Sequence, residues 1–275
     1  MTVTNAVETT MIWGTVSGAS MVGMVISLLL SVGLPIFLGI FIYKKTKAWV
    51  PAFFIGCGIF VGFAMILEQI CHAIVLTVTG SAIRDNIWLY AIYGGLAAAL
   101  FEECGRWIAM TFCLKKHLTR ENALMYGAGH GGIEAFLILG MSSMSNLLTA
   151  AMINGGLMEK TMTALEPAQQ EVTYHQLSVL WTTPAYQFYL APVERISAIA
   201  LQIALSILVY SAVKTGRKLH LAAAFGLHFA VDFLTVICAA AIPTWALELG
   251  LLLVVAVICV VVYQLVYVQM AEKKA

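Results

Sequence analysis

Charged residues are scarce in this 275-residue chain, because Asp, Glu, Lys and Arg together make up only 11% of it. Soluble domains carry about 25% charged residues, so the composition excludes an ordinary soluble protein. Hydrophobic residues account for 61% of the sequence. These proportions are typical of a polytopic membrane protein, in which each span must be largely apolar.

Three other absences narrow the class further. No basic residue precedes the first apolar segment, so the chain lacks the charged region of a cleaved signal peptide and we expect the first span to be retained. The six cysteines lie in apolar segments without Cys-x-x-Cys spacing, so we expect small buried side chains and no disulfides. No internal repeat or low-complexity tract is visible, which predicts a single membrane-embedded domain over residues 1–275.

Seven apolar segments are long enough, at about 20 residues each, to cross a bilayer. We expect these spans at 20–43, 49–79, 87–114, 122–140, 185–212, 219–241 and 245–270. The apolar stretch 142–155 is shorter, and we interpret it as a half-helix or as a re-entrant or interfacial piece. The predicted fold class is therefore all-α, a bundle of about seven transmembrane helices.

The basic residues support this count. With seven spans, eleven of the 15 Lys and Arg residues fall on one side, and only Arg84 and Lys160 fall on the other. The positive-inside rule then places the N-terminus outside and the C-terminus in the cytosol, as in a multi-pass protein of the plasma membrane. Segment 156–184 becomes an extracytoplasmic loop, which could form a lid or a short amphipathic element. An eighth span at 142–155 would move the last two basic clusters outside, so we disfavour it.

Ionisable residues inside the predicted spans are the strongest functional signal. Each costs roughly 2.5 to 3.5 kcal/mol on the insertion scale, so such residues are kept mostly for function. Three clusters stand out: Glu102, Glu103 and Arg106 in the third span, His130 and Glu134 in the fourth, and His228 and Asp232 in the sixth. The last two clusters are His-x-x-x-acid pairs, which place both side chains on one helical face, one turn apart.

The three clusters share one depth. Glu103 lies twelve residues before the basic cluster that follows its span, or about 18 Å from the cytosolic edge. His130 and His228 each lie ten residues beyond a basic residue, or about 15 Å from the same edge. We therefore expect them to meet around one cavity near the midplane, with a carboxylate within about 5 Å of an imidazole.

A second layer of ionisable groups is predicted about 30 Å from the cytosolic edge by the same arithmetic. It contains Glu68 and His72 in the second span and Glu194 and Arg195 in the fifth. These four residues could form a structural ion-pair network at the outer rim. They could instead gate the substrate or capture a carboxylate group.

The third-span cluster suggests a division of labour between two carboxylates. Arg106 is four residues from Glu102 and three from Glu103, so one glutamate can pair with it on the helix. The other glutamate is then free to act as a general base. The alternative is an intramembrane ion pair that only stabilises packing.

The two His-x-x-x-acid pairs allow two kinds of chemistry. His130, Glu134, His228 and Asp232 together could make a site of two imidazoles and two carboxylates, which suits zinc and a metal-activated water. In the metal-free alternative a glutamate activates water and the histidines stabilise the oxyanion. The sequence contains no His-Glu-x-x-His, so both alternatives stay open.

The motifs resemble those of known membrane proteases. Glu102-Glu103-x-x-Arg106, then Tyr126 and His130 four residues apart, then His228-x-x-x-Asp232, resembles the three-motif pattern of the CAAX-protease and bacteriocin-processing superfamily. The glycine-rich string from Gly127 to Glu134 is similar to that of the YhfC family of intramembrane metalloproteases. Two residues separate the Glu pair from Arg106, as in the related PrsW-type proteases, and the third motif ends in Asp232 where Asn is often found. The resemblance covers about 100–235.

The resemblance implies an endopeptidase that hydrolyses a membrane-associated peptide or protein. Its catalytic base would be Glu102 or Glu103, assisted by His130 and by His228 with Asp232. Zinc is the one cofactor implied, and the expected partners are membrane lipid and a peptide or protein substrate, with no nucleic acid. The sequence does not indicate an oligomeric state.

Two other functions stay open. Midplane Glu, His and Asp residues also form the relays of proton- or cation-coupled transporters. Such transporters often show inverted repeats, and none is visible here. A membrane scaffold could also keep the same residues to bind a peptide without cleaving it.

Overall fold

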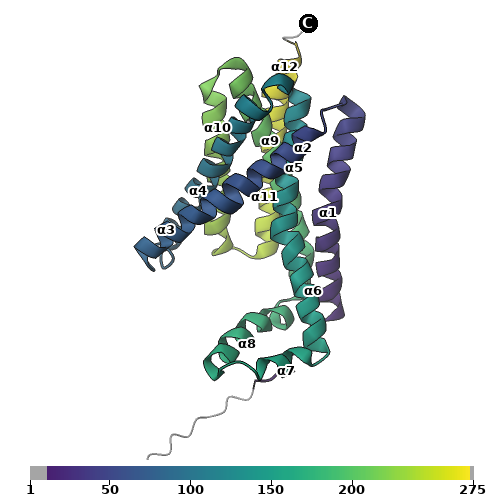
Figure 1. Ribbon diagram of the computed structural model, residues 1–275, viewed down its shortest axis with the longest axis vertical. Helices are drawn as coiled ribbons and strands as arrows, with labels where there is room; N and C mark the ends of the chain where they lie inside the picture. The colour runs from purple at the N-terminus through teal and green to yellow at the C-terminus, as the bar shows by residue number, and fades with distance from the viewer. Residues whose placement is uncertain (1–10, 273–275) are drawn as a thin grey trace, which may run out of the picture.

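The computed structural model describes residues 11–272, and the regular elements within that range are helical throughout, with no strand (Figure 1). The α-helices are α1 (Gly18–Thr46), α2 (Pro51–Phe60), α3 (Gln69–Thr79), α4 (Ile87–Ile108), α5 (Arg120–Ala135), α6 (Met141–Asn154), α7 (Leu157–Met162), α8 (Pro167–Thr182), α9 (Ala185–Thr215), α10 (Lys218–Ala239), α11 (Thr244–Val262) and α12 (Gln269–Glu272). Wider π-helical turns are η1 (Val61–Glu68), η2 (Ala109–Cys113), η4 (Phe136–Gly140) and η5 (Tyr263–Val268), and η3 (Lys115–His117) is a short 3-10 turn.

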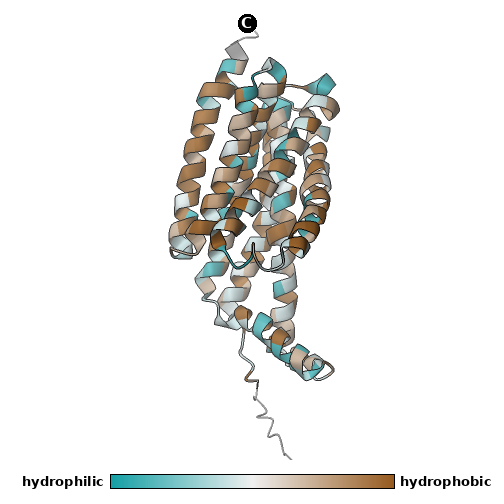
Figure 2. Ribbon diagram, turned by 90° about the vertical axis from the view of Figure 1, so that its left-hand side faces the viewer, coloured by the Kyte–Doolittle hydropathy of each residue, from teal (hydrophilic) through white to brown (hydrophobic). Residues whose placement is uncertain are grey.

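Seven helices within residues 11–272 are long and apolar enough to cross a membrane. They cover Gly18–Thr46, Pro51–Thr79, Ile87–Cys113, Arg120–Asn154, Ala185–Thr215, Lys218–Ala239 and Thr244–Val268. Their hydrophobic residues dominate the bundle, whereas hydrophilic residues gather at its ends and on α7 and α8 (Figure 2). The predicted all-α polytopic bundle of seven spans is confirmed.

The fourth span corrects one detail of the prediction. We expected 142–155 to be a half-helix or a re-entrant or interfacial piece, but α5, η4 and α6 form one continuous helix, Arg120–Asn154. The wide turn η4 carries the helix past Gly140 without reversing the chain. Its 35 residues measure about 52 Å, well beyond a hydrocarbon core of about 30 Å. The α6 end of this helix therefore projects out of the apolar slab, and the number of spans stays at seven.

Short polar residues set where the spans begin. Ser17, Asn86 and Thr119 precede α1, α4 and α5, and each side chain accepts a backbone N–H from the first turn of its helix. Such caps satisfy donors that have no partner inside the helix. At the other end of α9, Gly216 adopts φ 73°, a left-handed conformation that glycine tolerates without strain and that stops the helix.

Helix α9 forms the centre of the bundle. Most of its apolar stretch is buried, including Leu205 and Val209, whereas the other spans bury a third of theirs or less. Helices α5 and α11 pack against it, and α4 pairs with α10. Helices α10 and α4 also contact α9, so all three helices that carry the motifs touch the central helix.

Helices α7 and α8 form a second structural unit, which we call the distal cap. The cap packs against the start of α1 and the end of α6 around a small apolar cluster that includes Val16, Ala150 and Leu180. Asn154 joins the end of α6 to the segment before α1, because its side chain accepts from Val16 N and donates to Val16 O, each at 2.9 Å. The segment predicted as the loop 156–184 is thus largely helical.

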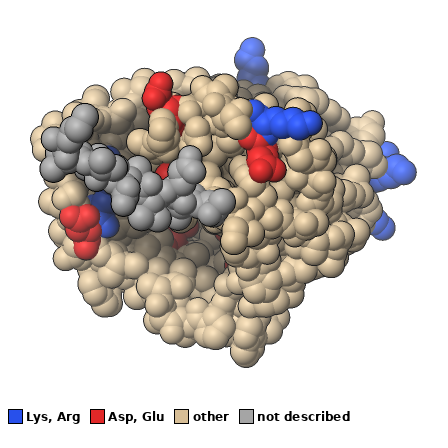
Figure 3. All heavy atoms as spheres, turned by 90° about the horizontal axis from the view of Figure 1, so that it is seen from below, with Lys and Arg blue, Asp and Glu red and all other residues tan. Residues whose placement is uncertain are grey.

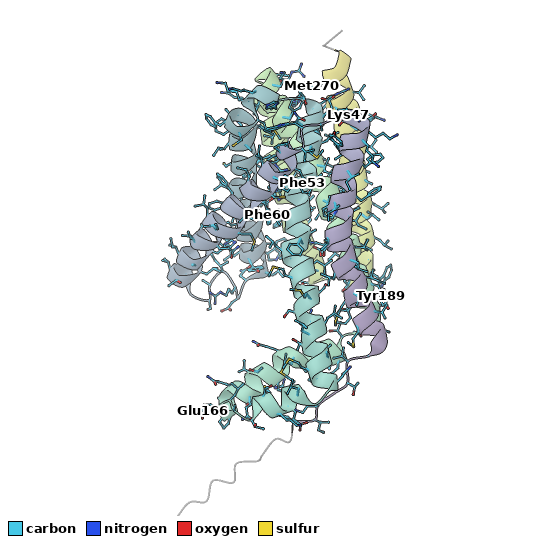
Figure 4. All side chains as sticks on the ribbon, turned by 45° about the vertical axis from the view of Figure 1, so that its right-hand side comes forward. Lys47, Phe53, Phe60, Glu166, Tyr189 and Met270 are labelled. Carbon is cyan, nitrogen blue, oxygen red and sulfur yellow. The ribbon has the colours of Figure 1, made fainter. Side chains whose placement is uncertain are left out.

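The distal cap lies at the end of the molecule opposite the basic residues that follow the first span and the C-terminal end of α11 and α12. Figure 4 shows Glu166, beside the cap, at one end and Lys47 with Met270 at the other. That the basic end faces the cytosol remains a prediction. Lys273 and Lys274, two of the basic residues counted for that prediction, lie outside the described residues. All six cysteines are free, but the prediction that their side chains are buried is wrong, because four are half-buried and Cys104 and Cys113 are exposed on the outside of the bundle.

The crossing of α2 and α5 depends on two glycines and generates a stability prediction. A methyl group on Gly129 would lie 1.9 Å from Phe53 O, and one on Gly56 would lie 2.2 Å from Tyr126 O. Gly129→Ala and Gly56→Ala should each lower the unfolding free energy by about 1–3 kcal/mol, because backbone atoms must move apart. Thermal unfolding in detergent measures this. Gly58→Ala on the same helix is the matched control, since nothing lies within 4 Å of its added methyl; equal melting temperatures for all three would contradict the close crossing.

Candidate active site

The three motifs predicted to share a depth meet in the structure. Helix α4 carries Glu102 and Glu103, α5 carries His130, and α10 carries His228. His130 Nε2 lies 2.9 Å from Glu102 Oε2, and His228 Nε2 lies 3.9 Å from the same oxygen. His228 Nδ1 lies 2.8 Å from Glu103 Oε1. Two imidazole nitrogens from different helices therefore point at one carboxylate oxygen.

The two adjacent glutamates occupy different environments. Glu103 is 2% exposed and lies between His228 and Arg106, whose Nε is 3.1 Å from Glu103 Oε2. Glu102 is less enclosed and lines a cavity together with His228. Glu103 has Arg106 and His228 as partners and does not line the cavity, whereas Glu102 is held at Oε2 by His130 and Gln202 and does line it.

Arg106 ties α4 to α9. Its side chain is fully buried, and Nη1 donates to Gln202 O and to Ser206 Oγ, each at 2.7 Å. Nη2 donates to Gln202 Oε1 and lies 3.9 Å from Glu102 Oε2. The guanidinium therefore touches both glutamates of its own helix and the backbone of the central helix.

Gln202 is a site residue that the sequence reasoning missed. Its Nε2 donates to Glu102 Oε2 and to Glu134 Oε2, each at 2.8 Å. The amide thus bridges the first and second motifs while its carbonyl oxygen accepts from Arg106. The sequence does place Gln202 at the depth of the motifs, because it lies twelve residues before Lys214, as Glu103 lies twelve residues before Lys115. An uncharged amide is not an ionisable group, so Gln202 does not stand out inside a span beside the charged residues and histidines.

A cavity of about 110 Å³ joins the two layers that the sequence placed separately. Its ionisable lining consists of Glu102, Glu134, Glu194, Arg195, His228 and Asp232. Arg195 Nη1 lies 3.1 Å from Glu134 Oε1, and Arg195 also pairs with Glu194 beside it. The long arginine side chain thus reaches from the outer layer to the second motif. Seen from the cap end, the surface is hollowed and acidic side chains lie within the hollow (Figure 3).

The remaining members of the outer layer lie apart from this cavity. Glu68 Oε1 is 3.2 Å from His72 Nε2, and His72 Nδ1 is 2.7 Å from Tyr93 OH. Neither Glu68 nor His72 lines the cavity. Asp232 does line it, with Oδ2 3.6 Å from His228 Nε2.

The donor chemistry of the site fits zinc. If ionised Glu103 accepts Nδ1–H of His228, the neutral ring keeps a free Nε2, as in the carboxylate–histidine pairs that support metal ligands. Tyr126 OH lies 3.5 Å from His130 Nδ1, so the second imidazole is also held on its far side. As they stand, no three His, Cys, Asp or Glu side chains among residues 11–272 are arranged to hold a metal ion. The ring nitrogens and carboxylates hydrogen-bond to one another instead.

Arg106 generates a testable prediction about the site's integrity. Arg106→Ala should lower the unfolding free energy by roughly 3–5 kcal/mol, because it leaves a buried carboxylate unpaired. Arg106→Met combined with Glu103→Gln removes both charges and should regain part of that loss. Thermal unfolding and monodisperse yield measure both effects, with exposed Arg217→Ala as the control. An Arg106→Ala protein as stable as the control would show that the pairing carries no stability.

Comparisons with known proteins agree with the motifs. A family model described as YhfC intramembrane metalloprotease matches residues 30–261, which contain all three motifs. The uncharacterized membrane protein YhfC of Bacillus subtilis (strain 168) is 43% identical over 204 residues, which cover 71% of this chain and 76% of that protein. No solved structure matches the chain. The chain therefore belongs to the YhfC family.

Proposed function

We propose that this protein is an intramembrane endopeptidase that hydrolyses a membrane-associated peptide or protein, with Glu102 as the general base. The observation that carries the proposal is the meeting of His130 Nε2, His228 Nε2 and Glu102 Oε2 beside a cavity that has room for water. The family description supports a membrane protease. The reaction class, hydrolysis of a peptide bond by activated water, is what these groups suit best.

The surroundings of the two glutamates favour Glu102 over Glu103 as the base. Glu102 is held at Oε2 by His130 and Gln202, so it would accept a proton from the attacking water at Oε1 and return it to the leaving amine nitrogen. Glu103, held between Arg106 and His228, would fix the orientation of the His228 ring. Arg106 would keep Glu103 ionised and hold α4 against α9.

A bound zinc ion would supply Lewis-acid polarisation of the scissile carbonyl and of the attacking water. His130 and His228 would hold it through Nε2, with an oxygen from Asp232, which lies beside His228. Glu134 was predicted as a ligand from its spacing, but its two oxygens lie against Arg195 and Gln202. We therefore assign Glu134 to the support of the cavity wall and, with Glu194 and Arg195, to substrate positioning.

The membrane setting completes the proposal. We place the protein in the plasma membrane with its basic end in the cytosol, so that the cavity opens toward the distal cap on the outer face. A substrate would then enter from the bilayer or from that face, and lipid would surround the spans.

Exchange of one glutamate at a time tests the assignment of the base. Glu102→Gln should lower cleavage of a membrane-peptide library by about 10²–10⁴-fold, because it removes proton transfer while keeping the size of the side chain. Glu103→Gln should lower cleavage by about 10–100-fold, as a residue acting through His228. Quantitative mass spectrometry of the products measures both.

The control is Glu171→Gln on α8, an exposed glutamate outside the cavity, which should cleave like the unaltered chain. A Glu102→Gln protein that keeps full cleavage would transfer the base role to another residue. Ion-dependent uptake into proteoliposomes by an unaltered chain that cleaves no peptide would favour the transporter function.

Metal content tests the role of the imidazoles separately. The purified protein should carry about one zinc per chain, with His130→Ala and His228→Ala losing it. Glu103→Gln should weaken zinc affinity by about 10–100-fold, since it supports His228 from behind. Elemental analysis and competition with chelators measure this, and His175→Ala on the exposed face of α8 is the control. Equal zinc content in all variants would move the metal away from this site.

A further inference from the structure

A second hollow lies beside the distal cap. It has a volume of about 530 Å³ and is bounded by α6, the C-terminal half of α8 and the start of α9. Its lining contains no charged residue but six uncharged polar ones: Ser145, Asn146, Thr149, Gln176, Thr183 and Gln187. Leu177, Leu180 and Phe188 supply its apolar wall. We call this hollow the polar groove.

The polar side chains of the groove keep their hydrogen-bonding groups free. None of the six forms a side-chain hydrogen bond within residues 11–272. Hydroxyls just outside the groove behave differently, because Ser142, Ser178 and Thr182 donate to backbone carbonyls of their own helices at 2.6, 2.7 and 2.8 Å. The groove therefore presents a set of donors and acceptors that no side chain or backbone group of residues 11–272 uses.

The groove and the catalytic cavity lie on the same face of α9. Gln187 in the groove is seven residues, two full turns, before Glu194 in the cavity, and Ala198 and Leu201 continue the same stripe. Along α9 the two hollows are thus about 10 Å apart.

The α5–α6 helix keeps the same relation across η4. Gly132 contacts Pro35 of α1 and Gly140 contacts Ser31 of α1, so positions eight residues apart share a face there. Eight residues on from Glu134, which lines the cavity, position 142 lies on the same face of the helix. Ser145 and Asn146, which line the groove, follow one turn later. Eleven residues separate Glu134 from Ser145, or about 16 Å.

We infer that the polar groove binds an extended stretch of the polypeptide substrate through hydrogen bonds to its main chain. This inference rests on the proposed endopeptidase function. Amide and hydroxyl side chains both donate and accept, which matches the alternating N–H and C=O groups of an extended chain. A phosphate headgroup would call for Arg or Lys, and the groove lining has neither. At about 3.3 Å per residue, the separation of 10–16 Å places the bound stretch about three to five residues from the bond that is cleaved.

The test measures binding apart from cleavage. The full chain carrying Glu102→Gln is placed in nanodiscs and titrated with a labelled peptide that has one Leu/Ala transmembrane segment and a neutral Gly/Ser/Thr tail on the cap side. A second peptide is identical except that its tail amides are N-methylated, which removes the main-chain donors. The unmethylated tail should bind at least about tenfold more tightly, as one or two hydrogen bonds require.

Groove variants locate the effect. Asn146→Leu with Gln187→Leu should abolish the difference between the two peptides, and Gln169→Leu, an exposed residue of α8 outside the groove, should leave it intact. Equal binding of both peptides to the Glu102→Gln chain would overturn the inference, and this comparison needs no groove variant to fold. A tail effect that survives the paired Leu variants would also overturn it, as would groove variants that change only the co-purified phospholipid.

The unaltered chain separates this inference from the proposed function. Cleavage of both peptides with equal KM would overturn the groove and support the endopeptidase. Tail-dependent binding that the groove variants abolish, without cleavage by the unaltered chain, would support the groove as a peptide site and overturn the endopeptidase.

Discussion

The Arg106 guanidinium lies fully buried between the helix that carries the two glutamates and the central helix of the bundle. A lone charge there would be strongly unfavourable, so its neighbours must supply carboxylates, a carbonyl and a hydroxyl at fixed positions. Gln202 and Ser206 accept hydrogen bonds from the guanidinium, and Glu103 lies beside its Nε as an ion-pair partner at 3.1 Å. Glu102 lines the cavity, and its Oε1 has no hydrogen-bond partner among residues 11–272, so the contacts around Arg106 also decide which acid is available for chemistry.

Close helix packing makes this polar cluster sustainable. In an apolar slab each buried donor and acceptor must find a partner inside the protein. Glycines bring α2 and α5 into backbone contact, and α5 in turn lies against α9. Gln202 can then reach carboxylates from both α4 and α5 with one amide nitrogen. Polar satisfaction and small residues at the crossings are thus two parts of one arrangement.

Much of the fold could be predicted because hydropathy and basic residues directly report the spans, and much of the site because helix rise converts sequence position into depth. The parts of the site and fold that could not be predicted depend on the reach of a side chain, on an uncharged polar group and on a change of helix type. Arg195 was assigned to the outer rim by its backbone position, yet its side chain reaches Glu134. Gln202 carries no charge, so it gave no signal on an insertion scale. The continuation of the fourth span past Gly140 depends on a wide turn that hydropathy does not report.

The wide turn η4 sits between the catalytic layer and the part of α6 that supports the distal cap. A π-helical turn accommodates one more residue than an α-helical turn, so η4 takes up an extra residue and keeps the face of the helix: Gly132 and Gly140 both face α1, although they are eight residues apart and not seven. Loss of one residue from Phe136–Gly140 would let the turn close to α-helical spacing with little rotation of α6. Gain of one residue would instead rotate α6 by about 100° relative to α5 and turn the cap away from the catalytic layer. The segment can therefore shorten by one residue far more easily than it can lengthen.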